Sequence, residues 1–303
     1  MLKIDEIKSY LDSNQVNYTF RGKDNLTILN YCPLNMLKDN CITWVRDTNN
    51  YDISIFDNYE NLLVVCNNDV QMNEKSRVNY IFTDNPHSIY FSLLNNFFNK
   101  NQQENETNIY NNSIVETEKI GKNVQIGHFC YIGKEVVIED NVVIKNNVSI
   151  EGKVKIGKDT VIYAGVVIGM DGYGYYDDIN NNHVRVPHLG GVIIGDNVEI
   201  GSNTCIAKGC LGDTIINDDV KIDNLCHIAH NVMIGKRSKI IALTMLGGSS
   251  IIGEDVWVAP CSAVKNQVLV GNDSLVGMGA VVTKNVESST IVAGVPAKLL
   301  KNK

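Results

Sequence analysis

The densest cluster of side chains that could do chemistry lies at residues 222–232, which read Ile-Asp-Asn-Leu-Cys-His-Ile-Ala-His-Asn-Val. A histidine exchanges protons near neutral pH, so it can act as the general base for an incoming nucleophile. His230 is our candidate, because it follows Ile228 by two residues, close to a turn of the chain. A carboxylate or a carbonyl would then orient its ring, and among the carboxylates spacing leaves both Asp213 and Asp223 open. The alternative is a surface histidine in a purely structural hydrogen bond.

Metal binding is a rival use of these histidines. His227 and His230 are three residues apart. A zinc site of the carbonic-anhydrase type needs three histidines that converge on the metal and leave a fourth position open. The two histidines flank Ile228 in one short segment, so their side chains need not converge. We therefore predict no bound metal.

These residues belong to a repeat in which an aliphatic residue occupies every sixth position. The repeat spans residues 120–168, 194–206 and 216–282, and holds nine, three and twelve such positions. A six-residue period is typical of a parallel β-helix, in which each hexad supplies one short strand and one corner. The aliphatic residue points inward, and the small or polar residue after it turns the corner. Three hexads make one triangular coil, so we predict a mainly β fold with about eight coils.

Composition excludes several classes of protein. The net charge is −7 and there is no long basic run, which argues against a nucleic-acid surface. The first 14 residues are amphipathic and acidic rather than a signal peptide, and no apolar stretch approaches the roughly 20 residues of a membrane span. The eight cysteines contain no CxxC pair and fit free thiols in a reducing compartment. We predict a cytoplasmic protein.

The part of the chain before the repeat reads as a small α/β domain. We expect helices at 1–14 and 87–98, the second with a proline near its first turn. Strand-like runs lie at 16–20, 26–29, 41–45, 53–56, 62–66 and 80–83. The predicted division is therefore an N-terminal domain at 1–98, a polar linker at 99–113, a β-helix at 114–290 and a tail at 291–303.

An insertion at 169–192 interrupts the repeat between whole coils. It carries three tyrosines and two histidines in a loop punctuated by glycines. Such loops on a rigid scaffold are common binding elements, although an insertion can also be merely tolerated. Because β-helices of this kind serve antifreeze proteins, hydratases and transferases alike, the fold alone does not decide the function.

Three segments together resemble the UDP-3-O-acylglucosamine N-acyltransferases of the lipid A pathway. They are 84–94 (DNPHSIYFSLL), 168–175 (IGMDGYGY) and 211–235 (LGDTIINDDVKIDNLCHIAHNVMIG), within a resemblance over about residues 1–275. The resemblance implies a left-handed β-helix and a homotrimer with active sites between subunits. It also implies an N-terminal domain that holds uracil. His230 matches the histidine that deprotonates the sugar amine as it attacks an acyl thioester.

The same resemblance supplies the substrate-binding candidates. The DGYGY sequence at 171–175 matches the DGFGY loop of that family, and the IDN sequence at 222–224 matches its IDN segment. Trp44, the last residue of the strand Ile42-Thr43-Trp44, and Tyr51 resemble the two aromatic residues that stack on uracil in that family. This chain has one extra residue between the two. With the neighbouring His227, these candidates are Trp44, Tyr51, Asp171, Gly172, Tyr173, Tyr175, Asp223, Asn224 and His227.

The chain departs from that family in places that concern the acyl donor. Asn266-Gln267 stand where the family has a second histidine, and the family's C-terminal helices have no counterpart before Lys303. The ending GMGAVVTKNV…VAGVPAKLLKNK resembles hexapeptide acetyltransferases that use coenzyme A. That resemblance implies room for the pantetheine arm and lysines for its phosphates, although lysines here could simply be solvated. The oxyanion could meet a backbone N–H at a glycine-rich corner, and both Gly247 and Gly248 are open for this role. The expected donor-binding residues are Gly248, Gly277, Gly279, Ala280, Lys284 and Lys298.

We therefore predict an N-acyltransferase that moves an acyl group from acyl-CoA to the amine of a nucleotide-linked amino sugar for a surface glycan. The acyl donor is a co-substrate, and we expect no permanently bound cofactor. One alternative is the lipid A pathway reaction itself, with a 3-hydroxyacyl-acyl carrier protein as donor. Another, of a different class, is a non-catalytic protein that binds nucleotide sugars or serves as a scaffold.

Overall fold

The computed structural model describes residues 1–46, 53–70, 78–99 and 106–302. The chain divides into two compact units, Met1–Gln103 and Glu104–Lys303, which are described separately below. Among the described residues, no helix has the length and apolar character that a membrane crossing requires.

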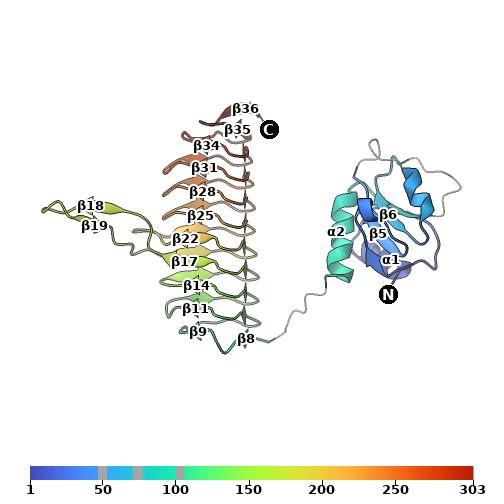
Figure 1. Cartoon of the computed structure of the whole chain (residues 1–303), viewed down its shortest axis with the longest axis horizontal. Helices are drawn as coiled ribbons and strands as arrows, with labels where there is room; N and C mark the ends of the chain where they lie inside the picture. Colours follow the sequence, from blue (N-terminus) through green and yellow to red (C-terminus); the bar gives the residue numbers. More distant parts are fainter. Residues whose placement is uncertain (47–52, 71–77, 100–105, 303) are drawn as a thin grey trace. The chain divides into compact units, whose positions relative to one another are not determined.

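The first unit is a five-stranded sheet with both helices on one face (Figure 1). β7 lies between an antiparallel neighbour, β2, and a parallel neighbour, β6, and the remaining strands are also parallel. The helices bury an apolar face against the sheet, and a second apolar cluster covers its other side. In sheet order the strands are β2 (Thr19–Arg21), β7 (Asn79–Phe82), β6 (Leu63–Cys66), β5 (Cys41–Trp44) and β4 (Asn30–Tyr31), with β1 (Leu2–Lys3) paired to β3 (Thr27–Ile28) beside them.

Local sequence explains where these helices begin. α1 spans Ile4–Ser13 and α2 spans Pro86–Phe97, as the sequence predicted. The side chain of Asn85 accepts a hydrogen bond from the Ser88 N–H at 3.1 Å, which satisfies one of the unpaired amides at the start of α2. The expected strand at 53–56 is wrong, because Ile53–Asn58 forms a 3₁₀ helix that buries Phe56. A run of four residues is too short for its period to distinguish the two structures.

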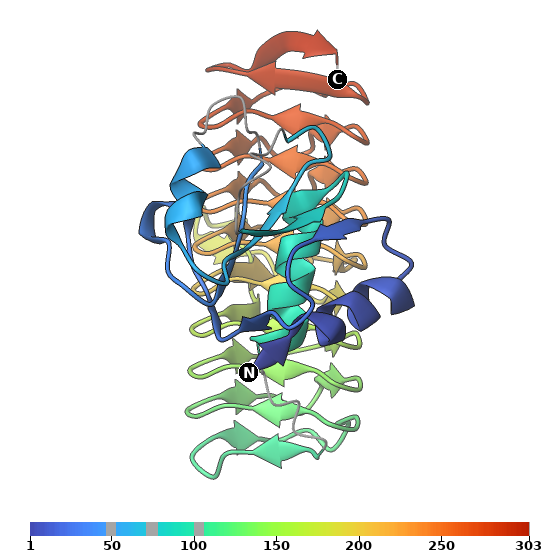
Figure 2. The same cartoon turned by 90° about the vertical axis from the view of Figure 1, so that its right-hand side faces the viewer.

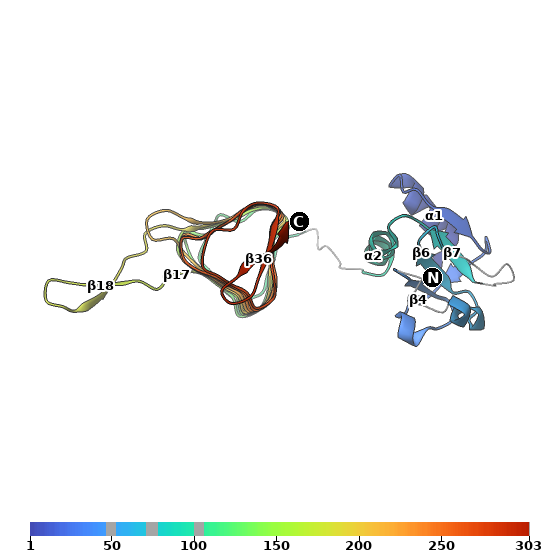
Figure 3. The same ribbon diagram turned by 90° about the horizontal axis from the view of Figure 1, so that it is seen from above.

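The second unit is a triangular solenoid of stacked parallel strands (Figures 2 and 3). Its three sheets contain 11, 9 and 7 strands, and we call them the first, second and third sheet. Each coil repeats the previous one in register, so that Ile228 pairs with Ile206 below it and with Leu246 above it. This confirms the mainly β, parallel solenoid that the hexad predicted.

The strands are short and follow each other around the triangle. The first sheet contains β8 (Asn108–Ile109), β10 (Gln125–Ile126), β13 (Val143–Ile144), β16 (Val161–Ile162), β21 (Glu199–Ile200), β24 (Lys221–Ile222), β27 (Lys239–Ile240), β30 (Trp257–Val258), β33 (Leu275–Val276), β35 (Thr290–Ala293) and the antiparallel β36 (Lys298–Asn302). The second contains β9 (Ile114–Val115), β11 (Tyr131–Ile132), β14 (Ser149–Ile150), β17 (Val167–Met170), β22 (Cys205–Ala207), β25 (His227–Ile228), β28 (Met245–Leu246), β31 (Ala263–Val264) and β34 (Val281–Val282). The third contains β12 (Val137–Ile138), β15 (Val154–Ile156), β20 (Val192–Ile194), β23 (Thr214–Ile216), β26 (Met233–Ile234), β29 (Ile251–Ile252) and β32 (Leu269–Val270).

The solenoid is taller than the eight coils predicted, because two sheets have more than eight strands. The additional strands lie where the period slips. Ile126 pairs with Ile109, and Val276 pairs with Val292, so neither pair keeps the 18-residue spacing of the central coils. As a consequence, β8 belongs to the solenoid although it lies in the expected linker at 99–113. The expected tail at 291–303 likewise supplies most of β35 and all of β36.

Each hexad buries two side chains rather than one. The second inward position lies two residues before the repeated aliphatic residue, as for Val124 before Ile126. In some coils this position is Ser or Thr, whose hydroxyl bonds to a carbonyl of a neighbouring coil. The Ser238 hydroxyl, for example, donates to the Gly253 carbonyl at 2.7 Å. A buried hydroxyl that is paired in this way costs little, whereas the Ser250 hydroxyl at the equivalent position has no partner among the described residues.

The corners are turned later in the hexad than expected. The left-handed backbone conformation falls three residues after the aliphatic residue, for example at Asn147 (φ 60°) and Asn203 (φ 58°). The glycine directly after the aliphatic residue serves a different purpose. A Cβ on Gly127 would lie only 2.5 Å from the Asn146 side chain of the next coil, so glycine permits the close stacking.

Asparagine and aspartate side chains hold successive corners together. The Asn146 Oδ1 accepts a hydrogen bond from the His128 N–H at 2.8 Å. Removal of this acceptor in Asn146→Ala should lower the free energy of unfolding by about 1 kcal/mol, the usual net worth of one hydrogen bond. Chemical denaturation would measure it, with Lys145→Ala, an exposed neighbour, as the control expected to change stability by less than about 0.5 kcal/mol. Equal effects in the two variants would contradict this account of the corners.

Candidate active site

Three parts of the chain that differ from a plain hexad meet at one corner of the triangle. The insertion at 169–192 leaves the second sheet at β17 and rejoins the third at β20. The irregular step at 208–213 joins β22 to β23, and His230 lies between β25 and β26. We call this corner, between the second and third sheets, the site edge. Figure 1 shows the hairpin of β18 (Tyr175–Asp177) and β19 (His183–Arg185) projecting from it.

The hydrogen bonds around His230 fix which nitrogen is free. Its Nδ1 lies 3.1 Å from the Oδ1 of Asn231. The same Oδ1 accepts the Cys210 N–H at 2.9 Å, while the Asn231 Nδ2 donates to the Gly212 carbonyl at 2.9 Å. Because this oxygen is an acceptor, the Nδ1 of a neutral His230 must carry the proton. The lone pair is then on Nε2, as a general base requires.

The orienting partner is a carbonyl, that of the Asn231 side-chain amide, and not one of the two candidate carboxylates. Asp213 instead accepts the Gly191 N–H at 2.7 Å. Asp223 accepts the Asn224 N–H at 2.7 Å, at a different corner. Neither therefore takes the role that the sequence left open between them. Residue spacing does not distinguish Asn231 from the other corner asparagines.

Gly248 occupies the site edge one coil beyond His230. A Cβ at this position would lie 2.6 Å from the Nε2 of His230 and 2.8 Å from its Cε1. The N–H of Gly247 donates to the Val264 carbonyl at 2.9 Å, whereas the hydrogen bonds of the described residues leave the Gly248 N–H unused. Of the two glycines, Gly248 is thus the one with an N–H available for a developing oxyanion beside His230.

The base of the insertion packs against His230. A Cβ on Gly172, which is buried, would lie 2.7 Å from the Nε2 of His188 and 3.0 Å from the Cβ of His230. The His188 and His230 rings meet edge to face, with centroids 5.4 Å apart. The sequence analysis did not select His188, since spacing does not reveal how an insertion folds back.

Asp171, also at the base of the insertion, is held by basic residues. Its Oδ1 lies 2.9 Å from the Nζ of Lys208, and its Oδ2 lies 3.9 Å from Arg185. The hydrogen bond from Lys208 lowers the pKa of the Asp171 carboxyl below its ordinary value. The pair therefore stabilises this contact above about pH 4, and the contribution is lost as the pH falls through the folded-state pKa.

We predict that Lys208→Met returns the pKa of Asp171 towards 3.8, the ordinary value of an aspartate. Arg185→Met is the matched control, since Arg185 is farther away, and its effect should be smaller. Carboxyl carbon NMR over an acid titration would measure both. An unchanged Asp171 titration in Lys208→Met would show that this lysine does not hold the carboxylate.

The predicted tyrosines lie on the exposed part of the insertion. Tyr173 is 85% exposed, and its ring centroid lies 5.3 Å from that of Tyr175. The guanidinium of Arg185 lies 5.6 Å from the Tyr175 ring centroid. These side chains form a small aromatic and basic surface on the hairpin, and none of them contacts His230 through a hydrogen bond or a ring contact in the described part of the chain.

Asp223, Asn224 and His227 are not brought to His230 within the chain. Asp223 and Asn224 lie at the corner between the first and second sheets, where Asn224 accepts the Ser202 N–H at 2.7 Å. They line a cavity of about 380 Å³ together with Tyr163, Glu199, Gly201, Lys221, Ile222, Lys239 and Ile241. His227 points outward from β25 and is exposed. In the described part of the chain, no three His, Cys, Asp or Glu side chains converge as a metal site would require.

The predicted donor-binding residues are spread over the end of the solenoid. Ala280 is fully buried in the core, so its expected place beside an external slot is wrong. A Cβ on Gly279 would meet open space, whereas one on Gly277 would lie 3.0 Å from the Ala293 side chain. Lys284 follows β34 at the site edge. Lys298 begins β36 and is exposed.

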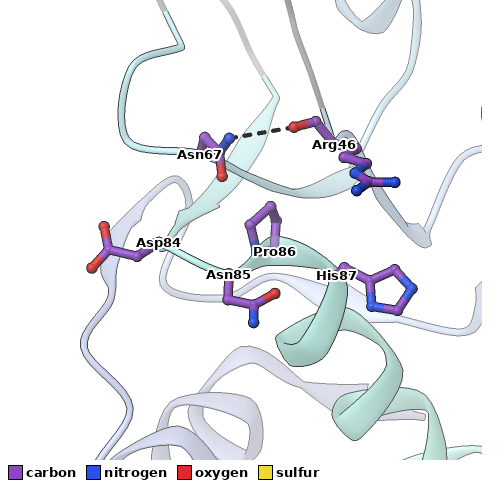
Figure 4. A pocket seen from close by; sticks show the side chains of 6 residues that line it. All are labelled: Arg46, Asn67, Asp84, Asn85, Pro86 and His87. Atoms are coloured by element: carbon purple, nitrogen blue, oxygen red, sulfur yellow. Dashed lines mark hydrogen bonds between the residues drawn. The ribbon is translucent and has the colours of Figure 1, made fainter. Parts of the chain in front are cut away.

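The first unit has an aromatic cluster of its own. Trp44 packs against α2, with ring centroids 5.0 Å from His87 and 6.0 Å from Phe91. Tyr51 lies outside the described residues. A cavity of about 390 Å³ opens beside the start of α2 (Figure 4). Its lining residues, none of them predicted as site residues, are Arg46, Asn67, Asp84, Asn85, Pro86 and His87.

Comparison with known families agrees with the solenoid. Residues 119–152 and 135–169 match the family model described as bacterial transferase hexapeptide (six repeats). The solenoid contains bacterial transferase hexapeptide repeats. The resemblance on which the sequence analysis relied is therefore confirmed at the level of this repeat.

Curated relatives confirm the resemblance over part of the chain. The UDP-3-O-acylglucosamine N-acyltransferase 2 of Legionella pneumophila (strain Lens) is 46% identical over 142 residues, 47% of this chain and 41% of that protein. A probable mitochondrial UDP-3-O-acylglucosamine N-acyltransferase 2 of Arabidopsis thaliana is 41% identical over 142 residues, 47% of each chain. The chain thus spans less than half the length of these relatives, and the match is shorter than the 1–275 we expected.

Solved structures show the same fold. A UDP-N-acetylglucosamine acyltransferase crystal structure aligns with a TM-score of 0.55 and 25% identity, over 63% of this chain and 73% of that one. The Francisella novicida UDP-N-acetylglucosamine acyltransferase aligns with a TM-score of 0.52 and 24% identity, over 65% and 71% of the two chains. These likenesses show that the second unit shares the β-solenoid fold of those structures.

Proposed function

We propose that this chain is an N-acyltransferase that acylates the amine of a UDP-linked amino sugar, with His230 as the general base. The observation that carries the proposal is the contact between the Nδ1 of His230 and the Oδ1 of Asn231 at 3.1 Å, which leaves Nε2 free for the amine. The relatives' names favour an acceptor of the UDP-3-O-acylglucosamine class. This is the lipid A pathway alternative of the sequence analysis, and it replaces the broader surface-glycan acceptor as our first choice.

The reaction uses one proton transfer to His230 and one proton transfer from it. The amine nitrogen attacks the thioester carbonyl carbon while the Nε2 of His230 takes a proton from the nitrogen. The resulting oxyanion accepts the Gly248 N–H. The carbon–sulfur bond then breaks, and the proton on His230 passes to the leaving sulfur. The products are an amide and a free thiol.

The site edge offers a path for the acyl donor. His230, Gly248, Asn266 and Lys284 follow one another along it, since their strands are in register. Three coils at about 4.8 Å each place Lys284 roughly 14 Å from the base along the edge. A thioester on a phosphopantetheine arm would reach His230 with its phosphate near this lysine. Coenzyme A and an acyl carrier protein both present that arm, and either is a co-substrate rather than a bound cofactor.

We further propose a left-handed coil and a cytoplasmic homotrimer in which the sites lie between subunits. The outward face of the third sheet carries an apolar stripe on successive coils, and an exposed stripe of this kind marks an interaction surface. Its members are Ile193, Met233, Ile251 and Leu269, which are 38–43% exposed. Sedimentation of the full chain would test the assembly, and a monomer at micromolar concentration would contradict it.

The first unit is our candidate for the nucleotide-binding domain. Phe91 and His87 surround the face of Trp44, and Phe91 is 43% exposed, so an aromatic base can stack within this cluster. Arg46 lines the neighbouring cavity and suits a phosphate group. Tyr51 retains its proposed role as the second stacking residue. Trp44→Ala should weaken UDP binding without altering the solenoid.

Thiol release provides the test of this function. Acetyl-CoA and a 3-hydroxyacyl-acyl carrier protein would each be mixed with the enzyme and UDP-3-O-acylglucosamine, or with other UDP- and dTDP-linked amino sugars. Amine-dependent release with UDP-3-O-acylglucosamine is the expected result, and the preferred donor identifies the carrier. Release with none of the pairs, while the chain still binds UDP sugars, would favour the non-catalytic binding protein.

A further inference from the structure

His188 is a buried histidine with one nitrogen left unpaired. Its side chain lies at the base of the insertion, and the residue is only 6% exposed. Its Nδ1 lies 2.9 Å from the Val186 carbonyl oxygen, whereas its Nε2 is buried without a hydrogen-bond partner among the described residues. A carbonyl only accepts, so Nδ1 carries the proton and the buried Nε2 carries a lone pair. Burying such an atom unpaired is unfavourable, which calls for a reason in function.

The Nε2 of His188 lies near the Cδ2 edge of the His230 ring. A single carbon at Gly172 would lie 2.7 Å from the Nε2 of His188 and 3.0 Å from the Cδ2 of His230, so both atoms border the same small space. The two rings are 5.4 Å apart and nearly perpendicular, at 74°. When His230 takes a proton, positive charge spreads over its whole ring, including the Cδ2–H edge. A lone pair beside that edge favours the charged ring over the neutral one.

We propose that His188 is a positioning residue that stabilises the His230 imidazolium formed during proton transfer from the amine. The inference rests on the proposed base role of His230. His188 adds a second neutral acceptor to the amide oxygen of Asn231, which is the contact of the His230 Nδ1. His188 acts through His230 and does not itself contact the reacting atoms.

The surrounding charges leave this interaction in place. Asp171 is paired with Lys208 at 2.9 Å and lies near Arg185, so its negative charge is largely neutralised locally. Asp213 is engaged by the Gly191 N–H, and the Cys210 thiol donates to the Pro187 carbonyl at 3.5 Å. The titratable groups on the elements packed around the two rings are therefore Asp171, Arg185, Lys208, Cys210 and Asp213.

Histidine NMR on the unliganded full chain tests the proposal without any substrate. The six ring signals are titrated, and His230 is assigned from its absence in His230→Gln. His188→Phe keeps an aromatic ring but removes the lone pair, so the midpoint of the His230 titration should fall by about one pH unit, a tenfold change in proton affinity. His188→Gln retains an acceptor oxygen and should restore most of the midpoint. A midpoint that is unchanged or higher in His188→Phe would overturn the proposal.

Kinetics then separate this inference from the proposed function. With an active donor and acceptor, His188→Phe should lower kcat about tenfold, change KM less than about twofold, and be rescued by His188→Gln. A loss of kcat that His188→Gln does not rescue would assign His188 a merely structural role. If His230→Ala retained full activity, the base role would fail. If His230→Ala lost activity but His188→Phe kept both its activity and the wild-type midpoint of the His230 titration, the inference would fail while the base role stood.

Discussion

His230→Ala should lower amine-dependent thiol release by about 10²–10⁴-fold, the usual worth of a positioned general base. The loss should fall on kcat, because the proton is taken as the amine attacks and not when the sugar binds. The solenoid should be unaffected, since the His230 side chain is not part of the core and the residue is only partly buried. The measurement is steady-state thiol release with the preferred donor and UDP-3-O-acylglucosamine.

His128→Ala is the matched control for this result. His128 is another solenoid histidine, and its Nδ1 bonds to Asn112 at 2.9 Å, at a corner between the first and second sheets. It should keep nearly full activity. Persistence of the wild-type rate in His230→Ala would mean that another group, such as the leaving sulfur, accepts the amine proton.

Gly248→Ala should lower kcat by roughly 10–100-fold, as a displacement of about 1 Å at the reacting groups can do. The new methyl group would occupy a point 2.6 Å from the Nε2 of His230. The nearest atoms belong to a side-chain ring and not to the backbone, so the ring moves and the coil stays in place. Thermal unfolding should therefore change little while activity falls.

Gly133→Ala is the control for the glycine substitution. It lies at the same edge, but its nearest neighbour is a carbonyl oxygen at 3.4 Å, an ordinary contact. We expect wild-type kcat in this variant. Wild-type kcat in Gly248→Ala as well would contradict the position that we assign to the His230 ring.

The hexad was sufficient to predict the solenoid but not its full extent. Aliphatic residues at every sixth position report directly on an interior column, so the central coils follow from the sequence. The end coils begin at Ile109 and finish near Val292, where the step between coils differs from 18 residues. Backbone hydrogen bonds tolerate such a change of corner length, whereas a search for a fixed period does not.

The misplacement of Ala280 has a related physical origin. Ala280 lies two residues before Val282 and so occupies the second inward position of its hexad. The sequence analysis assumed one inward residue in each hexad and therefore placed Ala280 on the outside. Asp223 and Asn224 lie one corner away from His230 because a six-residue step moves the chain to the next side of the triangle.

The place of His230 near a corner was predictable from its position two residues after the inward Ile228, whereas its proposed role as a base rests on the resemblance. Its neighbours were not predictable. His188 reaches it from 42 positions earlier in the sequence, through an insertion whose path depends on glycines at 169 and 172 and on backbone bonds to the 208–213 step. Contacts of this kind depend on three-dimensional packing, for which neither period nor composition carries a signal.

The central claim is that this chain forms an amide on a UDP-linked amino sugar. Mass spectrometry of UDP-3-O-acylglucosamine after incubation with the enzyme and each thioester donor tests it most directly. The account predicts one added acyl group that survives mild alkaline treatment as an amide, with an equal amount of thiol released. An acceptor that remains unmodified with every donor, or an added acyl group that alkali removes as an ester, would contradict it.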